Sequence, residues 1–375
     1  MSKVFHHVQV TIVNNCHSFI GEPLYLLGNF NNWEEPIHVG EVPAIGKEVT
    51  LDLGEVKSGD LELKLTRGTW DTVSCDKSGK AEPALRTKIQ KDVDLEISIE
   101  AWRDEFPKST ASNQVHILDE HFFFPELNVY RKVWIYLPKD YQENQFRYPV
   151  FYMHDGQNLF DENLSIGKSG PVEWMVDETL DKSERPAIVV AIDQAKTNEL
   201  RQQEYLVNPG QGTEKAQGWL YLEDIVNTLK PFIDKNYRTY PDSSNTIMVG
   251  SSIGGLLSVY AGLKYPEVFG QIVSFSPSIW MDEENLYEYS KKQFLKNVNA
   301  RKLQEFYFYI GDREGKFRFM ESNHNMKTDL EKYYSWLEEH FPGTLNFDVE
   351  NEGKHEVLFW QEAFRKFIER WQIRE

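Results

Sequence analysis

The first hundred positions show the hydrophobic pattern of short strands. Apolar and polar residues alternate with a period of two, which predicts strands that bury one face. These strands are expected at Val8–Val13, Pro23–Gly28, Glu48–Leu53, Leu61–Thr66 and Leu95–Ile99, with Gly, Asn and Pro between them. Short strands separated in this way are typical of a β-sandwich. We therefore predict a small all-β domain over residues 1–105 and a linker at 106–113, where most residues are small or polar.

The pattern changes from residue 114 onward, where strands that are apolar on both faces alternate with helical segments. Strands are expected at Val133–Leu137, Pro149–Met153, Ala187–Ile192, Thr246–Val249, Gln271–Phe275, Phe306–Ile310 and Leu345–Val349. Helices are expected at Val172–Leu180, Trp219–Tyr237 and Val357–Trp371. Apolar strands separated by helices predict a mostly parallel sheet covered on both faces. Residues 114–375 are thus expected to form a doubly wound α/β domain.

One junction in this domain carries a chemical signal. The strand Thr246–Val249 runs into Gly250-Ser251-Ser252-Ile253-Gly254, and an apolar helical pattern follows to Leu263. A strand, a sharp turn and a helix with a serine at the apex form the nucleophile elbow G-x-S-x-G. Ser252 is therefore the candidate nucleophile. The backbone N–H of Ile253, at the helix N-terminus, is a candidate donor to a developing oxyanion.

A serine hydroxyl needs an adjacent base, and in this arrangement the acid and then the histidine follow in loops after later strands. His355 comes after the last predicted strand and is the candidate base. His324 and His340 lie in a helical stretch and are expected at the surface. The loop after Phe306–Ile310 offers Asp312 and Glu314, and the residues alone leave both open as the triad acid.

A second oxyanion donor is expected in the loop after an earlier strand. Residues Met153–Phe160 leave the strand Pro149–Met153 in this way. Gly156 permits close approach of the backbone, and the N–H of Gln157 is the candidate donor. His154 precedes this loop and is expected to have a structural role.

Composition narrows the choice of partners. The formal net charge of −18 argues against binding to nucleic acid, whose phosphates require a basic surface. Cys16 and Cys75, the only cysteines, do not make a disulfide framework or a metal-ligand spacing. No apolar run has the length of a membrane span, and no signal-peptide core is present at the start. A cytoplasmic location is the expectation, although a leader that had been removed would leave no trace.

Two segments of the N-terminal region resemble a known module. Gly28-Asn29-Phe30-Asn31-Asn32-Trp33 and the later Lys64–Trp70 are similar to starch- and glycogen-binding immunoglobulin-like modules. In that family exposed tryptophans stack on sugar rings, so the resemblance implies Trp33 and Trp70 as candidate carbohydrate-binding residues. The alternative is that both indoles only pack the sandwich.

The second domain resembles an esterase family of α/β-hydrolases. The segments that carry the resemblance are Tyr152–Phe160, Glu204-Tyr205, Gly250–Gly255, Ser276–Trp280 and Gly311–Gly315. The family includes enterochelin esterases, feruloyl and acetylxylan esterases, S-formylglutathione hydrolases and mycolyltransferases. The resemblance implies an α/β-hydrolase fold, Glu314 as the triad acid, and a substrate cleft lined by Ser276–Trp280, with Trp280 in its wall.

Together these signals predict a serine esterase that works through an acyl-enzyme without a cofactor or a metal. An acyl or aryl ester of a carbohydrate is the first substrate hypothesis, because of the N-terminal module, and a siderophore ester is the alternative. Acyl transfer to an acceptor other than water stays open. An alternative of another class is a non-catalytic carbohydrate-binding protein on a hydrolase fold. The expected partner is a small-molecule or carbohydrate ester, with no nucleic acid and no membrane, and the oligomeric state is not indicated.

Overall fold

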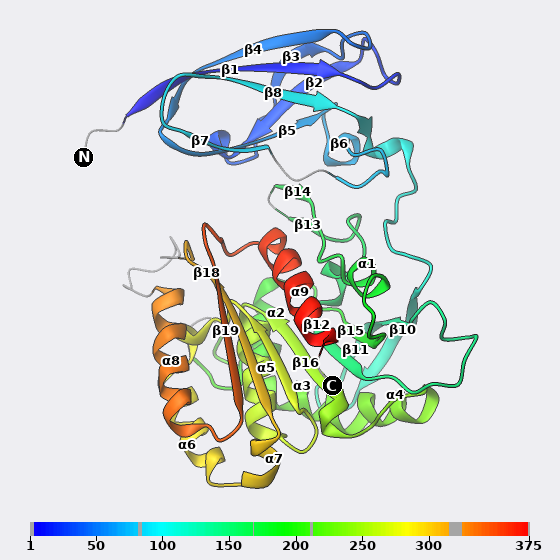
Figure 1. Ribbon diagram of the computed structural model, residues 1–375, viewed down its shortest axis with the longest axis vertical. Coiled ribbons are helices and arrows are strands. Elements are labelled where there is room, and N and C mark those ends of the chain that lie inside the picture. Colours follow the sequence, from blue (N-terminus) through cyan, green and yellow to red (C-terminus); the bar gives the residue numbers. More distant parts are fainter. Residues whose placement is uncertain (1–3, 82–84, 168, 211–212, 315–324, 374–375) are drawn as a thin grey trace. The chain divides into compact units, whose positions relative to one another are not determined.

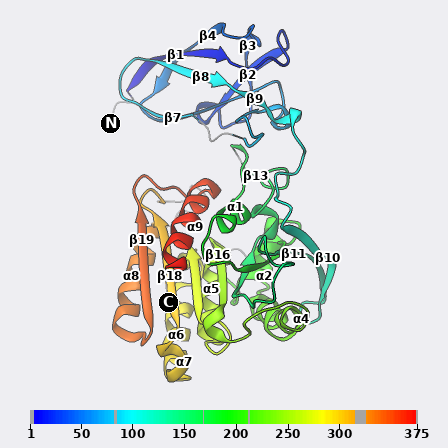
Figure 2. The same ribbon diagram turned by 45° about the vertical axis from the view of Figure 1, so that its right-hand side comes forward.

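The computed structural model describes residues 4–81, 85–167, 169–210, 213–314 and 325–373, which form two compact units (Figures 1 and 2). One unit comprises Met1–Thr110 together with Asp161–Glu173, and the other comprises Ala111–Phe160 together with Trp174–Glu375. The first unit is therefore completed by a segment, here called the excursion, that leaves the second unit after Phe160 and returns at Trp174.

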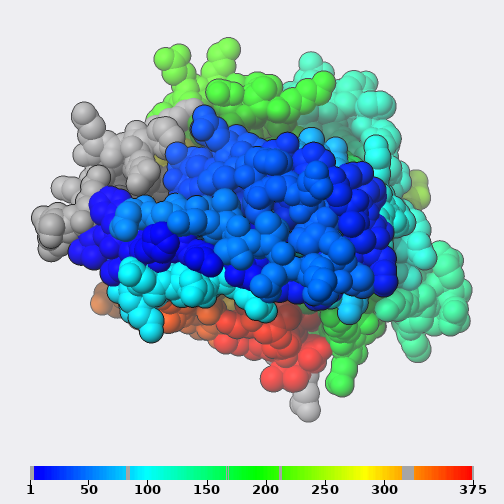
Figure 3. All heavy atoms as spheres, turned by 90° about the horizontal axis from the view of Figure 1, so that it is seen from above, coloured from blue at the N-terminus to red at the C-terminus, as the bar shows by residue number. Residues whose placement is uncertain are grey.

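The N-terminal unit has two facing sheets. One has the strand order β4 (Glu48–Lys57), β1 (Phe5–Asn14), β8 (Val93–Ile99), and the other β3 (Ile37–Glu41), β2 (Pro23–Gly28), β5 (Gly59–Thr66), β7 (Leu85–Ile89). The predicted period of two is confirmed, because alternate residues of both sheets fill one core: Val8, Val10, Ile12, Leu24, Leu26, Leu61, Leu63 and Leu65. Figure 3 looks onto the part of the unit that is coloured blue to cyan.

Short elements complete this unit. They are the strand pair β6 (Ser74–Cys75) and β9 (Ala101–Trp102), and the 3₁₀ turns η1 (Asn29–Asn31), η2 (Trp70–Thr72) and η3 (Arg103–Glu105). The excursion carries the strand pair β13 (Ile166–Gly167) and β14 (Gly170–Pro171).

Charged and aromatic contacts join the excursion to the rest of its unit. The buried carboxylate of Glu162 accepts a hydrogen bond from the N–H of Ala81 at 3.0 Å. Nζ of Lys80 lies 2.8 Å from Oε1 of Glu173, whose side chain is fully buried. A Cβ on Gly170 would lie 2.7 Å from the indole of Trp70, so only a glycine lets this strand approach the ring.

The second unit is built on an eight-stranded sheet. The strand order is β10 (Val115–Phe124), β11 (Val129–Tyr136), β15 (Ile188–Ile192), β12 (Val150–His154), β16 (Thr246–Ser251), β17 (Gln271–Phe275), β18 (Glu305–Gly311), β19 (Thr344–Glu350). Strand β10 pairs antiparallel with β11, and β11 antiparallel with β15, whereas all pairs from β15 to β19 are parallel. The predicted mostly parallel sheet is therefore confirmed.

Helices cover both faces of this sheet. They are α1 (Val176–Asp181), α2 (Asn198–Tyr205), α3 (Gly218–Asp224), α4 (Lys230–Asn236), α5 (Ile253–Lys264), α6 (Glu283–Phe294), α7 (Val298–Lys302), α8 (Met326–His340) and α9 (Val357–Gln372). Successive residues of β12 point to opposite faces: Tyr152 packs in the cluster that includes α3, α5 and α8, and Phe151 in the cluster that includes α1 and α9. Further short turns are η4 (Gly156–Asn158), η5 (Ile225–Leu229), η6 (Ser243–Asn245) and η7 (Ile279–Met281).

Some segments differ from the sequence prediction. The helix expected at Val172–Leu180 covers only Val176–Asp181, because the residues up to Glu173 belong to the excursion. The helix expected at Trp219–Tyr237 is present as a continuous helix over residues 218–236, in which the π-helical turn η5 lies between α3 and α4. No helix among the described residues combines the length and the apolar character needed to cross a bilayer.

Candidate active site

The candidate residues follow the carboxyl ends of neighbouring parallel strands. Ser252 follows β16, Ser276 follows β17, Glu314 lies after β18, and His355 lies after β19. Because β16 to β19 are adjacent and parallel, their ends meet at one edge of the sheet, where open α/β sheets bind ligands.

The elbow around Ser252 is tightly packed. Ser252 has φ 56° and ψ −122°, a backbone conformation that residues with a side chain rarely adopt. It occurs where the surrounding structure enforces it. A Cβ on Gly250 would lie 2.4 Å from the carbonyl oxygen of Gly254, so no other residue fits there. The helix α5 begins at Ile253, directly after the serine.

The structure brings Ser252, His355 and Glu314 into one hydrogen-bonded chain. Nε2 of His355 lies 3.0 Å from Oγ of Ser252, and Nδ1 of His355 lies 2.8 Å from Oε2 of Glu314. Glu314 is 2% exposed, whereas Asp312 is at the surface and uses its backbone N–H to bind the carbonyl of Glu350. Of the two carboxylates that the residues left open, Glu314 is the one that contacts the imidazole.

The other oxygen of Glu314 is also held. Oε1 accepts a hydrogen bond from the hydroxyl of Ser276 at 2.6 Å and another from the N–H of Gly311 at 2.9 Å. The indole N–H of Trp360 donates to Oγ of Ser276 at 3.0 Å, and the same indole meets the ring of His355 edge to face, with centroids 4.9 Å apart. These contacts fix the carboxylate and the imidazole that it binds.

Sequence reasoning missed this support. Ser276 was expected only as part of the cleft wall, and Trp360 lies on the apolar face of α9. A buried tryptophan on such a face has the same pattern as an ordinary core residue, so the sequence carries no signal for its contact with the histidine.

The segment Ser276–Trp280 does reach the nucleophile. Oγ of the buried Ser278 lies 3.2 Å from Oγ of Ser252, and the N–H of Ser278 donates to the carbonyl of Ser252 at 3.1 Å. Trp280 lies two residues further on in η7, half-buried and packed against the apolar cluster of α3, α5 and α8.

Both expected oxyanion donors lie in segments that meet at the elbow. Ile253 starts α5, and Gln157 lies in η4, directly after β12, which is the neighbour of β16. A Cβ on Gly254 would lie 3.4 Å from Oδ2 of Asp155, so the first turn of α5 packs against the start of the η4 loop. Within the described part of the chain, the N–H groups of Ile253 and Gln157 donate no hydrogen bond to another segment.

His154 and His340 are not part of this chain of contacts. His154 is buried, and its Nδ1 lies 3.1 Å from the hydroxyl of Tyr221. Burial lowers the pKa of His154 to about 4, which keeps the imidazole neutral near pH 7. His340 is exposed at the end of α8. His324 lies outside the described residues.

Trp33 and Trp70 lie together in the N-terminal unit. Both indoles are half-buried, with ring centroids 6.2 Å apart and planes inclined at 47°. Trp70 also packs against Gly170 of the excursion. The contact with Gly170 covers part of the Trp70 ring and leaves less of it for a sugar.

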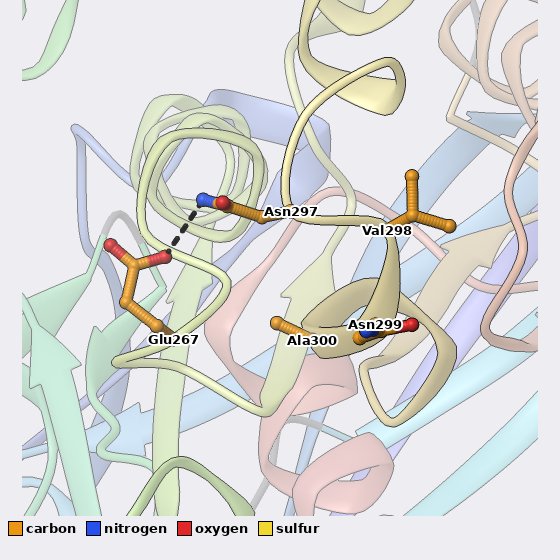
Figure 4. Close-up of a pocket in the computed structure, with 5 residues that line it drawn as sticks. All are labelled: Glu267, Asn297, Val298, Asn299 and Ala300. Carbon is orange, nitrogen blue, oxygen red and sulfur yellow. Dashed lines mark hydrogen bonds between the residues drawn. The ribbon is translucent and has the colours of Figure 1, made fainter.

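A cavity of about 510 Å³ lies elsewhere in the second unit (Figure 4). It is lined by Glu267, Asn297, Val298, Asn299 and Ala300. These residues precede β17 and β18 in the chain, so the cavity lies near the amino ends of these strands, whereas Ser252, Glu314 and His355 lie beyond the carboxyl ends. It is therefore separate from the candidate active site.

The parallel sheet with its serine elbow defines an α/β-hydrolase. A family model described as "Putative esterase" matches residues 125–369, so the chain belongs to this esterase family. Membership of the family makes the protein an esterase, in preference to the non-catalytic alternative.

The curated relatives include proteins of known and unknown activity. "Uncharacterized protein YbbA" of Bacillus subtilis is 28% identical over 64% of this chain and 91% of its own length. The iron(III) enterobactin esterase of Escherichia coli K12 is 31% identical over 40% of this chain and 33% of its own. An endo-1,4-beta-xylanase/feruloyl esterase of Xylanibacter ruminicola is 28% identical over 40% of this chain and 20% of its own.

One solved structure extends the likeness to the N-terminal unit. The enterobactin esterase FES of Shigella flexneri matches with a TM-score of 0.51 over 95% of this chain and 89% of its own, at 15% identity. At that identity the match shows a shared fold, and its coverage of 95% means that it extends into the N-terminal unit of this chain.

Proposed function

We propose that this esterase cleaves carboxylic esters through an acyl-enzyme, with Ser252 as nucleophile, His355 as general base and Glu314 as the residue that orients His355. The observation that carries the proposal is the chain of contacts from Ser252 Oγ to His355 Nε2, at 3.0 Å, and from His355 Nδ1 to Glu314, at 2.8 Å. Serine hydrolases of unrelated folds use the same constellation.

In the first half-reaction Ser252 Oγ attacks the ester carbonyl and Nε2 of His355 takes the hydroxyl proton. The proton on Nδ1 stays hydrogen-bonded to Glu314, which stabilises the imidazolium. The N–H groups of Ile253 and Gln157 stabilise the oxyanion of the tetrahedral intermediate. When the intermediate collapses, the bond to the alcohol breaks and His355 gives its proton to that alcohol.

The second half-reaction removes the acyl group. His355 accepts a proton from a water molecule, whose oxygen attacks the acyl carbonyl, and the collapse of the second intermediate returns the proton to Ser252 Oγ. The products are a carboxylic acid and a free enzyme, so no cofactor is needed. An acceptor alcohol in place of the water would give acyl transfer by the same steps.

For the substrate we place a siderophore ester first. The support is the two-domain likeness to an enterobactin esterase over 95% of the chain, since the match includes the N-terminal unit. An acyl or aryl ester of a carbohydrate is the second candidate. It is supported by the relative named as a feruloyl esterase, which matches 40% of the chain, and by the Trp33–Trp70 pair. It ranks second because Gly170 covers part of the Trp70 ring.

A panel of esters tests the proposal. The purified chain is given a p-nitrophenyl ester, ferric enterobactin and a feruloylated arabinoxylan fragment, and each is repeated with Ser252→Ala. We expect turnover of the p-nitrophenyl ester and one natural ester, and a loss with Ser252→Ala on the order of 10⁴–10⁶-fold in kcat. A fluorophosphonate should label the wild type and not the variant. Labelling that persists in the variant, or that maps to Ser251, would refute Ser252 as the nucleophile.

A further inference from the structure

The loop that carries the proposed oxyanion donor Gln157 begins in an unfavourable conformation. Asp155, directly after β12, has φ 58° and ψ 46°, in the left-handed region that residues other than glycine seldom occupy. Its carboxylate is buried and is bound by Arg201 through two parallel hydrogen bonds, Nε to Oδ1 and Nη2 to Oδ2, each of 2.7 Å. Its backbone N–H donates to the hydroxyl of Tyr205 at 3.3 Å.

The residues after Asp155 are fixed from the other side. A Cβ on Gly156 would lie 3.0 Å from Oδ1 of Asp193 and about as close to the backbone at the end of β15. The side chain of Gln157 accepts a hydrogen bond from the N–H of Gln194 at 3.1 Å. The loop is thus held between α2, which carries Arg201, and the segment after β15.

The Arg201–Asp155 pair is not explained by stability alone. Its side chains are 12% and 9% exposed, and a buried ion pair adds little stability compared with apolar residues of the same size. What a guanidinium does well is to fix a planar carboxylate in one orientation through its fork of donors. Asp155 immediately precedes η4, so its backbone conformation sets the direction in which the loop that carries Gln157 leaves β12.

We propose that Arg201 is a positioning residue of the oxyanion hole, which acts through Asp155 to aim the backbone N–H of Gln157 at the substrate carbonyl. The inference rests on the proposed function. It assigns to α2 a part in catalysis, although Arg201 is hydrogen-bonded to Asp155 and not to Ser252. An oxyanion donor stabilises the transition state more than the bound substrate, so misplacing it lowers kcat with little change in KM.

The chain offers a matched control. Arg131 and Glu204 form a second buried ion pair, with side chains 14% and 7% exposed, and Glu204 lies on the same helix α2. Replacing Arg131 therefore breaks an equally buried pair at α2 and leaves the Asp155 carboxylate in place.

The experiment compares Arg201→Met, Arg201→Lys and Arg131→Met in the full chain, with kcat and KM on a p-nitrophenyl ester, the rate of fluorophosphonate labelling and the melting temperature. We expect Arg201→Met to lower kcat and the labelling rate about 100-fold or more, as loss of an oxyanion donor does, with KM changed less than about threefold. Arg201→Lys should recover only part of the loss, since an ammonium lacks the planar fork that makes the two parallel bonds. Arg131→Met should lower kcat less than about fivefold at a similar melting temperature.

Several outcomes would overturn the inference. Equal losses of kcat in Arg201→Met and Arg131→Met would mean that the pair only supports the fold, and a rise in KM at constant kcat would mean that Arg201 binds substrate. If Arg201→Met does not fold, Asp155→Asn, which keeps the shape of the side chain, takes its place. The same result is expected, a lower kcat with little change in KM. A wild type that is neither labelled nor active on any ester would refute the proposed function itself. An active wild type with an equally active Arg201→Met would refute only the role of Arg201.

Discussion

The hydroxyl of Ser276 donates a hydrogen bond to Oε1 of Glu314 over 2.6 Å, while Oε2 of the same carboxylate faces Nδ1 of His355 at 2.8 Å. Each oxygen of the acid therefore has its own donor. A carboxylate can accept a hydrogen bond at each of its two oxygens. An amide in the place of Glu314 has only one oxygen, so its NH2 group would face the hydroxyl of Ser276 or the N–H of His355, which are both donors.

We accordingly predict that Glu314→Gln lowers kcat by about 10²–10⁴-fold, because the amide cannot accept at both oxygens and the imidazole loses its orienting partner. Asp312→Asn should change kcat less than about threefold, since Asp312 lies at the surface. Steady-state kinetics on a p-nitrophenyl ester measure both. A larger loss in Asp312→Asn would make Asp312 the acid, and two small losses would mean that His355 works nearly unaided.

A second prediction concerns Ser276 itself. Ser276→Ala removes the donor to Glu314 and leaves the buried indole N–H of Trp360 without its acceptor. We expect a loss of about 1–3 kcal/mol of unfolding free energy and a fall in kcat of about tenfold. Ser290→Ala is the control, because Ser290 is equally buried and hydrogen-bonded in α6, away from the triad. If both variants keep wild-type kcat, Ser276 contributes to the fold only.

A third prediction follows from His154. Burial lowers its pKa in the folded state to about 4, whereas an unfolded chain has about 6.5. Protonation therefore favours the unfolded chain, and the stability that this group contributes is present above pH 6.5 and is lost as the pH falls toward 4. Through His154 alone the unfolding free energy should fall by about 3 kcal/mol between pH 7 and pH 4.

Other groups act in the opposite direction in the same range. Burial raises the pKa of Asp193 to about 6 and that of Asp177 to about 7, so their protonation favours the folded state as the pH falls. The test is therefore the difference between wild type and His154→Gln in denaturant unfolding at pH 7, 5.5 and 4. The wild type should lose its advantage over the variant as the pH falls. Parallel curves would show that His154 does not titrate in this way.

A fourth prediction separates packing from sugar binding in the N-terminal unit. Because Trp70 packs against Gly170 and Trp33, we expect Trp70→Ala to lower the unfolding free energy by about 2–4 kcal/mol, and Trp33→Ala by less. Turnover of a small p-nitrophenyl ester should be unchanged below the melting transition, since remote binding does not lower the barrier. Melting curves are run beside a polysaccharide pull-down. Glycan retained by the wild type and lost in stable variants would instead make the pair a binding platform.

The nucleophile and the base could be proposed from sequence because each is marked locally. Ser252 lies in a five-residue pattern flanked by a predicted strand and a predicted helix, and His355 follows the last predicted strand. The choice of Glu314 over Asp312 came from a family resemblance. The sequence does not distinguish Asp312 from Glu314, because only the fold of the loop buries Glu314 and leaves Asp312 exposed.

The support around the triad could not be found in the same way. The contact of Ser276 with Glu314 spans 38 residues, and its contact with Trp360 spans 84. Contacts of this range depend on how helices pack on the sheet, which leaves no local trace. The edge strand β10 was missed for another reason, since its centre carries Asp119, Glu120 and His121 and its register shifts there.

The excursion has a consequence for how such a protein can change over evolution or by engineering. The chain passes between the two units at 110/111, 160/161 and 173/174, so a single cut in the chain would not separate the N-terminal unit from the rest. A recombination that exchanged residues 1–110 alone would bring in a foreign module that lacks the contacts made to Glu162, Glu173 and Gly170. These three residues would then be exposed. The two units are therefore expected to be inherited, duplicated and lost together, and a chimaera would need to carry residues 161–173 along with the module.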